Sequence, residues 1–263
     1  MARRRWWSVL LAPIVLLPAG CGFELNLPDR RSSAPPPGAQ APPDPGHPPP
    51  EVRLGTAEDR PLPPESRPQA QLADWARPIA ESTGVSATAL QAYGYAALAV
   101  QASAPECGLT WTTLAGVGAV ESRHGTLGGT ELDGTGRPQE PIIGVPLDGS
   151  AEVRRVDDTD GAAYDGDPVF DRAVGPLQFI PETWERWAVD ADLDGRADPH
   201  DIDDAALAAA RYLCSQGEDM SDPEGFWETV LVYNQSNSYV QDVVDYADHY
   251  GGLSRPPQPG ERD

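Results

Sequence analysis

The chain has 263 residues, enough for one or two folded domains, and its formal net charge is −22, with arginine as the only strongly basic residue type. This acidity argues against nucleic-acid binding and against electrostatic adhesion to anionic lipids or anionic wall polymers. A polyanionic partner would have to be bound in a groove of complementary shape. Divalent cations, in contrast, are attracted by the negative net charge.

The first 21 residues have the pattern of an export signal. Three arginines at positions 3–5 precede an apolar run over 6–17 that is too short to span a bilayer as a mature helix. The run ends in Pro18-Ala19-Gly20-Cys21, which resembles the lipobox of bacterial lipoproteins and makes Cys21 the expected lipidation site. We expect the protein in the cell envelope, lipid-anchored to the outer face of the cytoplasmic membrane, or secreted after ordinary signal cleavage.

The next segment, 22–68, is rich in proline and is predicted to be a disordered, extended tether, because such a composition cannot bury a core. The folded domain is predicted over 69–252, and 253–263 form a short disordered tail. Two cysteines, Cys107 and Cys214, fall inside the predicted domain. In an oxidising compartment they are expected to form one disulfide; the alternative is two buried thiols.

Within 69–252 the apolar spacing and the capping residues predict a mostly α domain without a convincing sheet. Residues 126–172 are rich in glycine, aspartate and proline, and are predicted to be a long irregular insert with at most a short hairpin. Its role is open. The predicted helices cover 72–83, 86–103, 110–121, 181–189, 204–216, 223–234 and 239–250.

Glu121 is predicted at the end of the third helix, directly after the small and apolar stretch 114–120, and Gly125 is placed to end the helix. A carboxylate there is partly buried and close to the negative end of the helix dipole, and both features disfavour its charged form. The position therefore suits a general acid better than a surface glutamate.

Motifs for zinc proteases, α/β-hydrolases, nucleotide binding and paired-cysteine metal sites are absent from the sequence, and the four histidines are scattered. Three segments in order, AVESRHG at 119–125, RAVGPLQFIPETW at 172–184 and VYNQSNSYV at 232–240, resemble the lytic murein transglycosylases. The similarity is greatest to the membrane-bound B-type branch, which has a lysozyme-like domain.

The resemblance implies cleavage of the MurNAc–GlcNAc β-1,4 bond of peptidoglycan without water, giving 1,6-anhydro-MurNAc ends. Glu121 would act first as the acid and then as the base, and the N-acetyl group of the substrate would assist. The matching groove residues would bind the sugar, although each one taken alone could equally be a core residue: Gln178, Tyr212, Tyr233, Asn234 and Tyr239.

Residues 190–196, DADLDGR, have aspartates at positions 1, 3 and 5 and a glycine at position 6, which is the ligand spacing of an EF-hand loop. A standard loop would close at Asp201, whereas the resemblance implies closure at Asp204. The predicted Ca²⁺ ligands are Asp190, Asp192, Asp194, the carbonyl of Arg196, and Asp204. The alternative is an aspartate-rich turn without metal; no organic cofactor is expected.

Two other functions remain open from the sequence. A hydrolytic muramidase would need a second carboxylate near Glu121, for which Asp133 and the aspartates of 157–167 are candidates. A non-catalytic peptidoglycan-binding lipoprotein would keep the groove without turnover. The partner in each case is the glycan strand, with the membrane contacted only through the lipid, and the protein is expected to be a monomer.

Overall fold

The computed structural model describes residues 41–150 and 153–255, and seven α-helices are the main regular elements of this part of the chain. Residues 1–40, which include Cys21 and the predicted export signal, and residues 256–263 lie outside the described part. The mostly α architecture confirms the predicted fold class and is consistent with a lysozyme-like domain. The helices are α1 (Ala73–Thr83), α2 (Ala87–Ser103), α3 (Trp111–Ser122), α4 (Pro181–Trp187), α5 (Ile202–Cys214), α6 (Pro223–Tyr233) and α7 (Asn237–Ser254).

Local capping explains where several helices begin. The side chains of Ser86 and Thr110 accept hydrogen bonds from the third backbone N–H of α2 and α3, as the sequence predicts. Asp201 caps α5 by accepting from the second backbone N–H of the helix, that of Asp203, so this helix begins two residues earlier than predicted. Gly84, with φ of 76°, ends α1 in the left-handed conformation that favours glycine.

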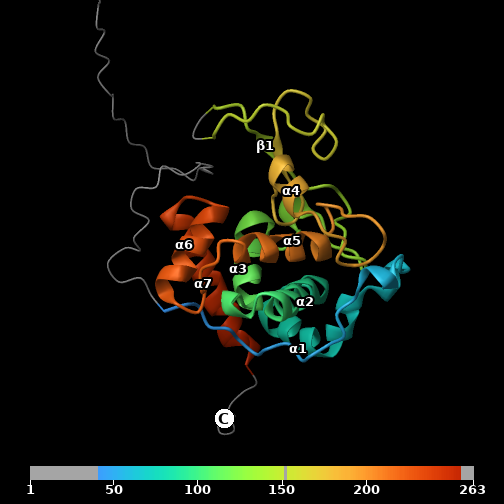
Figure 1. Cartoon of the computed structure of the whole chain (residues 1–263), viewed down its shortest axis with the longest axis vertical. Helices are drawn as coiled ribbons and strands as arrows, with labels where there is room; N and C mark the ends of the chain where they lie inside the picture. Colours follow the sequence, from blue (N-terminus) through green and yellow to red (C-terminus); the bar gives the residue numbers. More distant parts are fainter. Residues whose placement is uncertain (1–40, 151–152, 256–263) are drawn as a thin grey trace, which may run out of the picture.

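Helix α3 lies in the centre of the domain and packs against α2 and α7 (Figure 1). Two glycines allow its neighbours to approach closely. A Cβ atom at Gly116 would lie 2.5 Å from the carbonyl oxygen of Val243, and one at Gly118 would lie 2.1 Å from the hydroxyl of Tyr93. Because almost every position of α3 is buried, its last residues are held inside the protein rather than on its surface.

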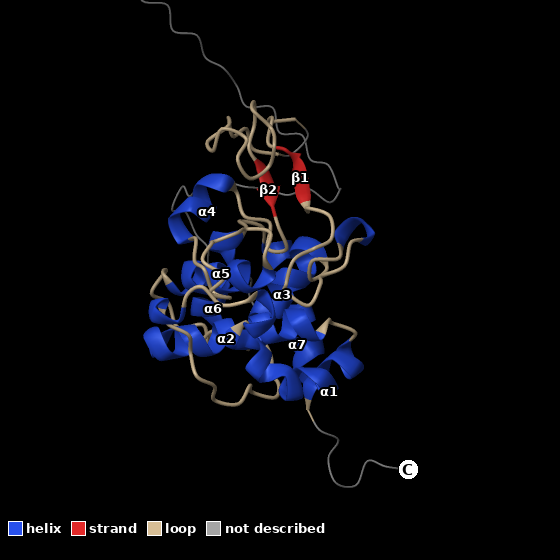
Figure 2. Ribbon diagram, turned by 90° about the vertical axis from the view of Figure 1, so that its right-hand side faces the viewer, coloured by secondary structure: helices blue, strands red, loops and turns tan. Residues whose placement is uncertain are grey.

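The insert contains a small antiparallel sheet made of β1 (Ile143–Pro146) and β2 (Arg172–Val174). Ile143 pairs with Val174, and Pro146 pairs with Arg172. The sheet and its long connecting loop form one end of the molecule next to α4, with α1 at the opposite end, as both Figure 1 and Figure 2 show. The long segment 147–171 joins the two strands, and β2 extends past residue 172, so this sheet is not a short hairpin within the insert.

Residues 41–68 pack on the helical domain, which corrects the prediction of a disordered tether for this part of the chain. The indole N–H groups of Trp75 and Trp111 both donate to the carbonyl of His47, at 3.2 and 3.1 Å. The backbone N–H of Gly55 donates to the hydroxyl of Tyr95 at 2.7 Å. The composition of the segment could not predict these contacts. They join its backbone groups to side chains of helices that come later in the chain.

The predicted disulfide is confirmed: Cys107 and Cys214 are bonded across 107 residues of sequence. The bond joins the short 3₁₀ turn Pro105–Cys107 to the last residue of α5. Among the described residues, no helix combines the length and the apolar character that a membrane span requires.

Candidate functional site

Glu121 is the penultimate residue of α3, and its side chain is only 5% exposed. The helix ends immediately afterwards because Arg123 and His124 both have positive φ, at 54° and 59°. The backbone N–H of Arg123 caps the helix by donating to the carbonyls of Ala119 and Gly118. Burial raises the pKa of Glu121 to about 8, so its carboxyl group is mostly protonated at neutral pH.

The carboxyl group of Glu121 has one described hydrogen-bond donor, the hydroxyl of Tyr239 on α7, at 2.6 Å from Oε1. This bond favours the charged carboxylate and so opposes part of the effect of burial on its pKa. Glu121 in turn raises the pKa of both Tyr239 and Tyr233, after burial itself. The three side chains therefore form one electrostatically linked group, in which Glu121 and Tyr239 are buried and Tyr233 is half-buried.

A tight turn over Gly175–Gln178 places Gln178 beside this group. Gly175 has φ of 75°, and a Cβ atom there would lie 1.8 Å from the carbonyl oxygen of Pro199, so only glycine fits. Gln178 also has a positive φ, and its side-chain N–H donates to the carbonyl of Gly175 at 2.9 Å. The hydroxyl of Ser122 donates to the carbonyl of Pro176 at 2.6 Å, which ties the turn to the end of α3.

A pocket of about 150 Å³ opens along these elements, and four of the predicted groove residues line it. Glu121 and Tyr239 are buried and do not line this pocket; Tyr233, whose pKa Glu121 raises, is the residue of their group that does. The rings of Tyr212 and Tyr233 have centroids 5.8 Å apart, and Phe179 lies 6.0 Å from Tyr233. The predicted residues in the pocket wall are Gln178, Tyr212, Tyr233 and Asn234.

The hydroxyl groups of the two pocket tyrosines have internal partners. Tyr233 donates to the carbonyl of Leu177 at 2.8 Å, and Tyr212 donates to the carbonyl of Val232 at 3.1 Å. Asn234 differs, since its buried Oδ1 has no hydrogen-bond partner in the described part of the chain. A buried amide oxygen without a donor is costly.

His124 lies three residues after Glu121, and no pattern in the sequence indicates its role. Its ring Nδ1 lies 3.2 Å from the hydroxyl of Tyr93, and its Nε2 lies 2.8 Å from the hydroxyl of Tyr250. Burial lowers the pKa of His124 to about 4, so the ring is neutral at pH 7. The chain Tyr93–His124–Tyr250 therefore fixes the segment after Glu121 against α2 and α7.

The predicted metal loop brings three of its members together. Ligand oxygens of Asp190, Asp192 and Asp204 lie within 4.8 Å of one another, and all three residues are buried. Asp190 Oδ1 has no hydrogen-bond partner among the described residues. Burial raises the pKa of Asp204 to about 9, with Asp201 as the next cause, and that of Asp192 to about 6, where the charges of Asp194 and Asp203 add to burial. An unpartnered oxygen among buried acids fits a cation ligand.

The other predicted members of the loop are used differently. Asp194 accepts a hydrogen bond from Arg137 at 3.0 Å and one from the backbone N–H of Arg196 at 2.8 Å. Asp201 caps α5 and lies 3.3 Å from Arg137, so Asp204, not Asp201, completes the group. The spacing of a standard EF-hand loop indicates Asp201 as the closing ligand, and only the family resemblance indicated Asp204.

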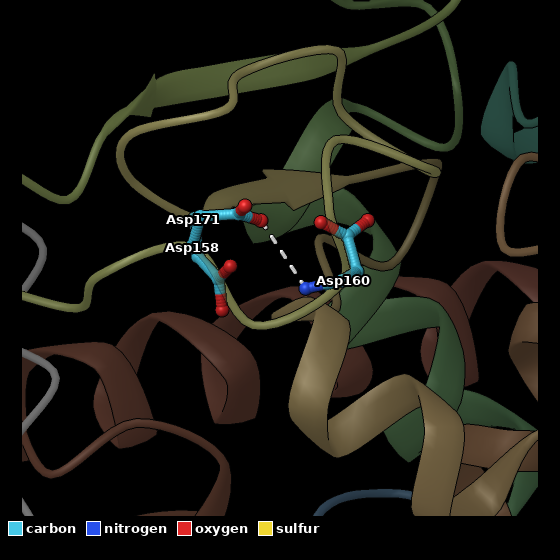
Figure 3. Close-up of side chains that lie close together, drawn as sticks. All are labelled: Asp158, Asp160 and Asp171. Atoms are coloured by element: carbon cyan, nitrogen blue, oxygen red, sulfur yellow. Dashed lines mark hydrogen bonds between the residues drawn. The ribbon is translucent and has the colours of Figure 1, made fainter.

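A second acidic group lies in the insert, where Asp158, Asp160 and Asp171 surround one small space (Figure 3). These carboxylates already accept hydrogen bonds from donors of their own loop. Asp171 accepts from the backbone N–H and the hydroxyl of Thr159, Asp158 accepts from three successive N–H groups, and Asp160 accepts from those of Ala162 and Tyr164. The group organises the loop, and nothing else about it indicates a ligand.

Comparison with known proteins gives one match. Residues 170–230 match the family model described as Transglycosylase SLT domain, a segment that contains β2, α4, α5 and most of α6, with Gln178 and Tyr212. No curated protein and no solved structure matches the chain. Glu121 and Tyr239 lie outside the matched segment and come to it only through the tertiary structure. The match supports a lytic transglycosylase-like domain in this chain.

Proposed function

We propose that the protein is a peptidoglycan lytic transglycosylase with Glu121 as its catalytic acid and base. One observation carries the proposal: a buried glutamate, protonated at neutral pH, is electrostatically linked to Tyr233 of a tyrosine-lined pocket, and residues 170–230 of the same domain match the transglycosylase family model. A non-catalytic binding module has no use for a carboxyl group whose pKa is raised to about 8.

The proposed reaction has two proton transfers. Glu121 first protonates the glycosidic oxygen of the MurNAc–GlcNAc bond, and the N-acetyl carbonyl of the substrate attacks C1 as that bond breaks. The C6 hydroxyl then attacks C1 and displaces the acetamido oxygen, while the Glu121 carboxylate takes the hydroxyl proton. The product is a 1,6-anhydro-MurNAc end, Glu121 is again protonated, and water is not consumed. A single carboxyl group with a pKa near neutrality serves both steps.

The pocket residues supply the binding. Gln178 has an amide oxygen free to accept from the N–H and O–H groups of an N-acetylated sugar, and Asn234 lines the same pocket. The rings of Tyr212 and Tyr233 offer faces for stacking on sugars. Tyr239 stabilises the carboxylate form of Glu121 between the two proton transfers.

Hydrolysis by a muramidase is the second candidate, and the structure gives it less support. The residues proposed as a second carboxylate are engaged in their own loops. Asp133 accepts from the backbone and hydroxyl of Thr135, Asp157 pairs with Arg155, and Asp167 pairs with Arg172. The causes of the pKa shift of Glu121 also include no neighbouring acid.

We further propose, from the sequence resemblance, the membrane-bound B-type branch, with export and lipidation at Cys21. The Asp190, Asp192 and Asp204 group would hold Ca²⁺, which would link the end of α4 to the start of α5 as a structural ion. The proposed lipidation and the proposed Ca²⁺ site are independent of each other and of the catalytic role of Glu121.

Mass spectrometry of purified peptidoglycan digested with residues 22–263 tests the proposal. Anhydro-muramoyl products from the wild type, and none from Glu121→Gln, are expected. The matched control is Glu185→Gln, an exposed glutamate on α4 outside the pocket, which should behave like the wild type. Reducing-end products would instead make the protein a hydrolase, and binding without products would make it a wall-binding protein.

A further inference from the structure

Two adjacent arginines in the insert, Arg154 and Arg155, lie on opposite faces of an extended segment. The segment pairs with both flanking stretches, since Val156 N–H donates to the carbonyl of Leu147 at 2.8 Å and Asp171 N–H donates to the carbonyl of Val156 at 3.2 Å. In an extended chain successive side chains point to opposite sides. Alternate residues of this segment should therefore have different surroundings.

The contacts follow this alternation. Arg155 and Asp157 share one face, where they form an ion pair at 2.7 Å and the guanidinium of Arg155 lies 4.9 Å from the ring centroid of Phe170. Arg154 and Val156 share the other face and line the same pocket as the groove residues. The insert thus adds one cationic side chain to the pocket wall.

Arg154 is exposed and has no ion-pair partner within 41–150 and 153–255, although the protein is rich in acids. The one carboxylate in the same pocket wall, Glu182, faces Arg186 at 3.9 Å. The described arginines that do form ion pairs are Arg53, Arg60, Arg67, Arg77, Arg137, Arg155, Arg172, Arg186, Arg196 and Arg255.

An unpaired guanidinium in a polar groove binds carboxylates well, because its N–H groups match both carboxylate oxygens. It also offsets, at the point of contact, the repulsion that a net charge of −22 exerts on an anionic ligand. Peptidoglycan strands carry carboxylates on the lactyl arm of the muramoyl unit, either the lactyl carboxylate itself or those of an attached stem peptide.

We propose that Arg154 is a specificity-determining residue that binds a carboxylate on the lactyl arm of the glycan strand. This inference rests on the proposed function and adds a recognition site to it. Arg154 does not take part in the proton transfers, so its contribution should be to binding rather than to the chemical step.

The test compares Arg154→Gln with its neighbour Arg155→Gln as the matched control. Three substrates are used: strands with stem peptides, strands stripped of peptides by an amidase, and strands whose carboxylates have been converted to amides. On carboxylate-bearing strands Arg154→Gln should raise KM about tenfold with kcat unchanged. On amidated strands it should match the wild type, and Arg155→Gln should match the wild type throughout. Arg154→Lys should retain part of the affinity, since it keeps the charge but not the planar pair of donors.

A loss confined to peptide-bearing strands would assign the contact to the stem, and a loss confined to stripped strands would assign it to the lactyl carboxylate. No change on any strand, or an equal change on amidated strands, would overturn the proposal. A second readout separates this failure from that of the proposed function. Soluble strands should bind Glu121→Gln about tenfold more tightly than Glu121→Gln/Arg154→Gln, whether or not the wild type turns them over; equal affinities would also overturn the inference.

Discussion

The hydroxyl of Tyr239 donates a 2.6 Å hydrogen bond to Glu121, 118 residues earlier in the chain, and both side chains are buried. Burial alone would push the pKa of Glu121 still further up; the tyrosine holds it at about 8. At that value the group can give a proton at neutral pH and later accept one. This pairing is the basis of the proposed mechanism.

Tyr239→Phe should move the alkaline limb of the activity profile. In the wild type kcat/KM should fall as pH rises through about 8, because the acid form of Glu121 is lost. Without the tyrosine hydroxyl the carboxylate loses its stabilising partner, so the limb should move to higher pH and kcat should fall about 10- to 100-fold. Profiles of kcat/KM between pH 5 and 10 check this; Tyr246→Phe, an exposed tyrosine on the same helix, is the control. A limb at unchanged pH would contradict the assignment.

Glu121→Gln should stabilise the protein as pH rises. The pKa of Glu121 is raised from 4.5 to about 8 by folding, so the unfolded chain releases this proton first and the wild type loses stability between these pH values. The variant lacks this loss, and its advantage should reach on the order of 3 kcal/mol at pH 8 and little at pH 4. Urea unfolding at several pH values measures it, with Glu185→Gln as the control. A pH-independent difference would refute the raised pKa.

Gly175→Ala should damage the turn that carries Gln178. Its positive φ alone costs about 1 kcal/mol in an L-residue, and the contact of 1.8 Å with Pro199 requires the backbone to move, for a total loss of about 3 kcal/mol or more. Gly84→Ala is the matched control, because Gly84 has nearly the same φ but no atom within 4 Å of the added Cβ. Unfolding free energies and KM should both separate the two variants; similar losses would show that the close approach is unimportant.

Adding Ca²⁺ to wild-type protein that has first been treated with a chelator should raise its melting temperature. For a site with Kd of about 1 mM, 10 mM Ca²⁺ stabilises by about 1.4 kcal/mol, or a few degrees. Asp204→Asn should abolish the shift, whereas Asp194→Asn should retain most of it, because Asp194 pairs with Arg137. The shift is compared within each variant, so differences in baseline stability cancel. A full shift in Asp204→Asn would place the ion elsewhere.

Replacing both Cys107 and Cys214 by serine should lower the free energy of unfolding by about 2–4 kcal/mol, because the bond closes a loop of 107 residues. Urea unfolding of the variant, and of the wild type with and without reductant, measures the change. Reductant should have no effect on the variant. Equal stabilities of oxidised and reduced wild type would mean that the bond contributes nothing.

The features that the sequence determined by itself are those set by neighbouring residues. Periodicity and capping at Ser86 and Thr110 predicted the helices, and the apolar run before Glu121 predicted a buried carboxyl group, which the structure confirms. Cysteine parity predicted the disulfide. Each of these rests on interactions within a few turns of chain or on simple counting, so no knowledge of the packing was needed.

The tertiary structure decided which distant groups meet. Only the packing of the helices brings the hydroxyl of Tyr239 to Glu121. It also pairs Asp194 with Arg137, so that Asp204 is the residue that joins Asp190 and Asp192. The contacts of residues 41–68 with the helices are likewise tertiary. The tertiary structure also turns Arg154 toward the pocket and Arg155 away from it, although the two have the same chemistry. Such contacts depend on the relative placement of whole elements, which is fixed by the summed burial of many side chains and not by the local pattern at either partner.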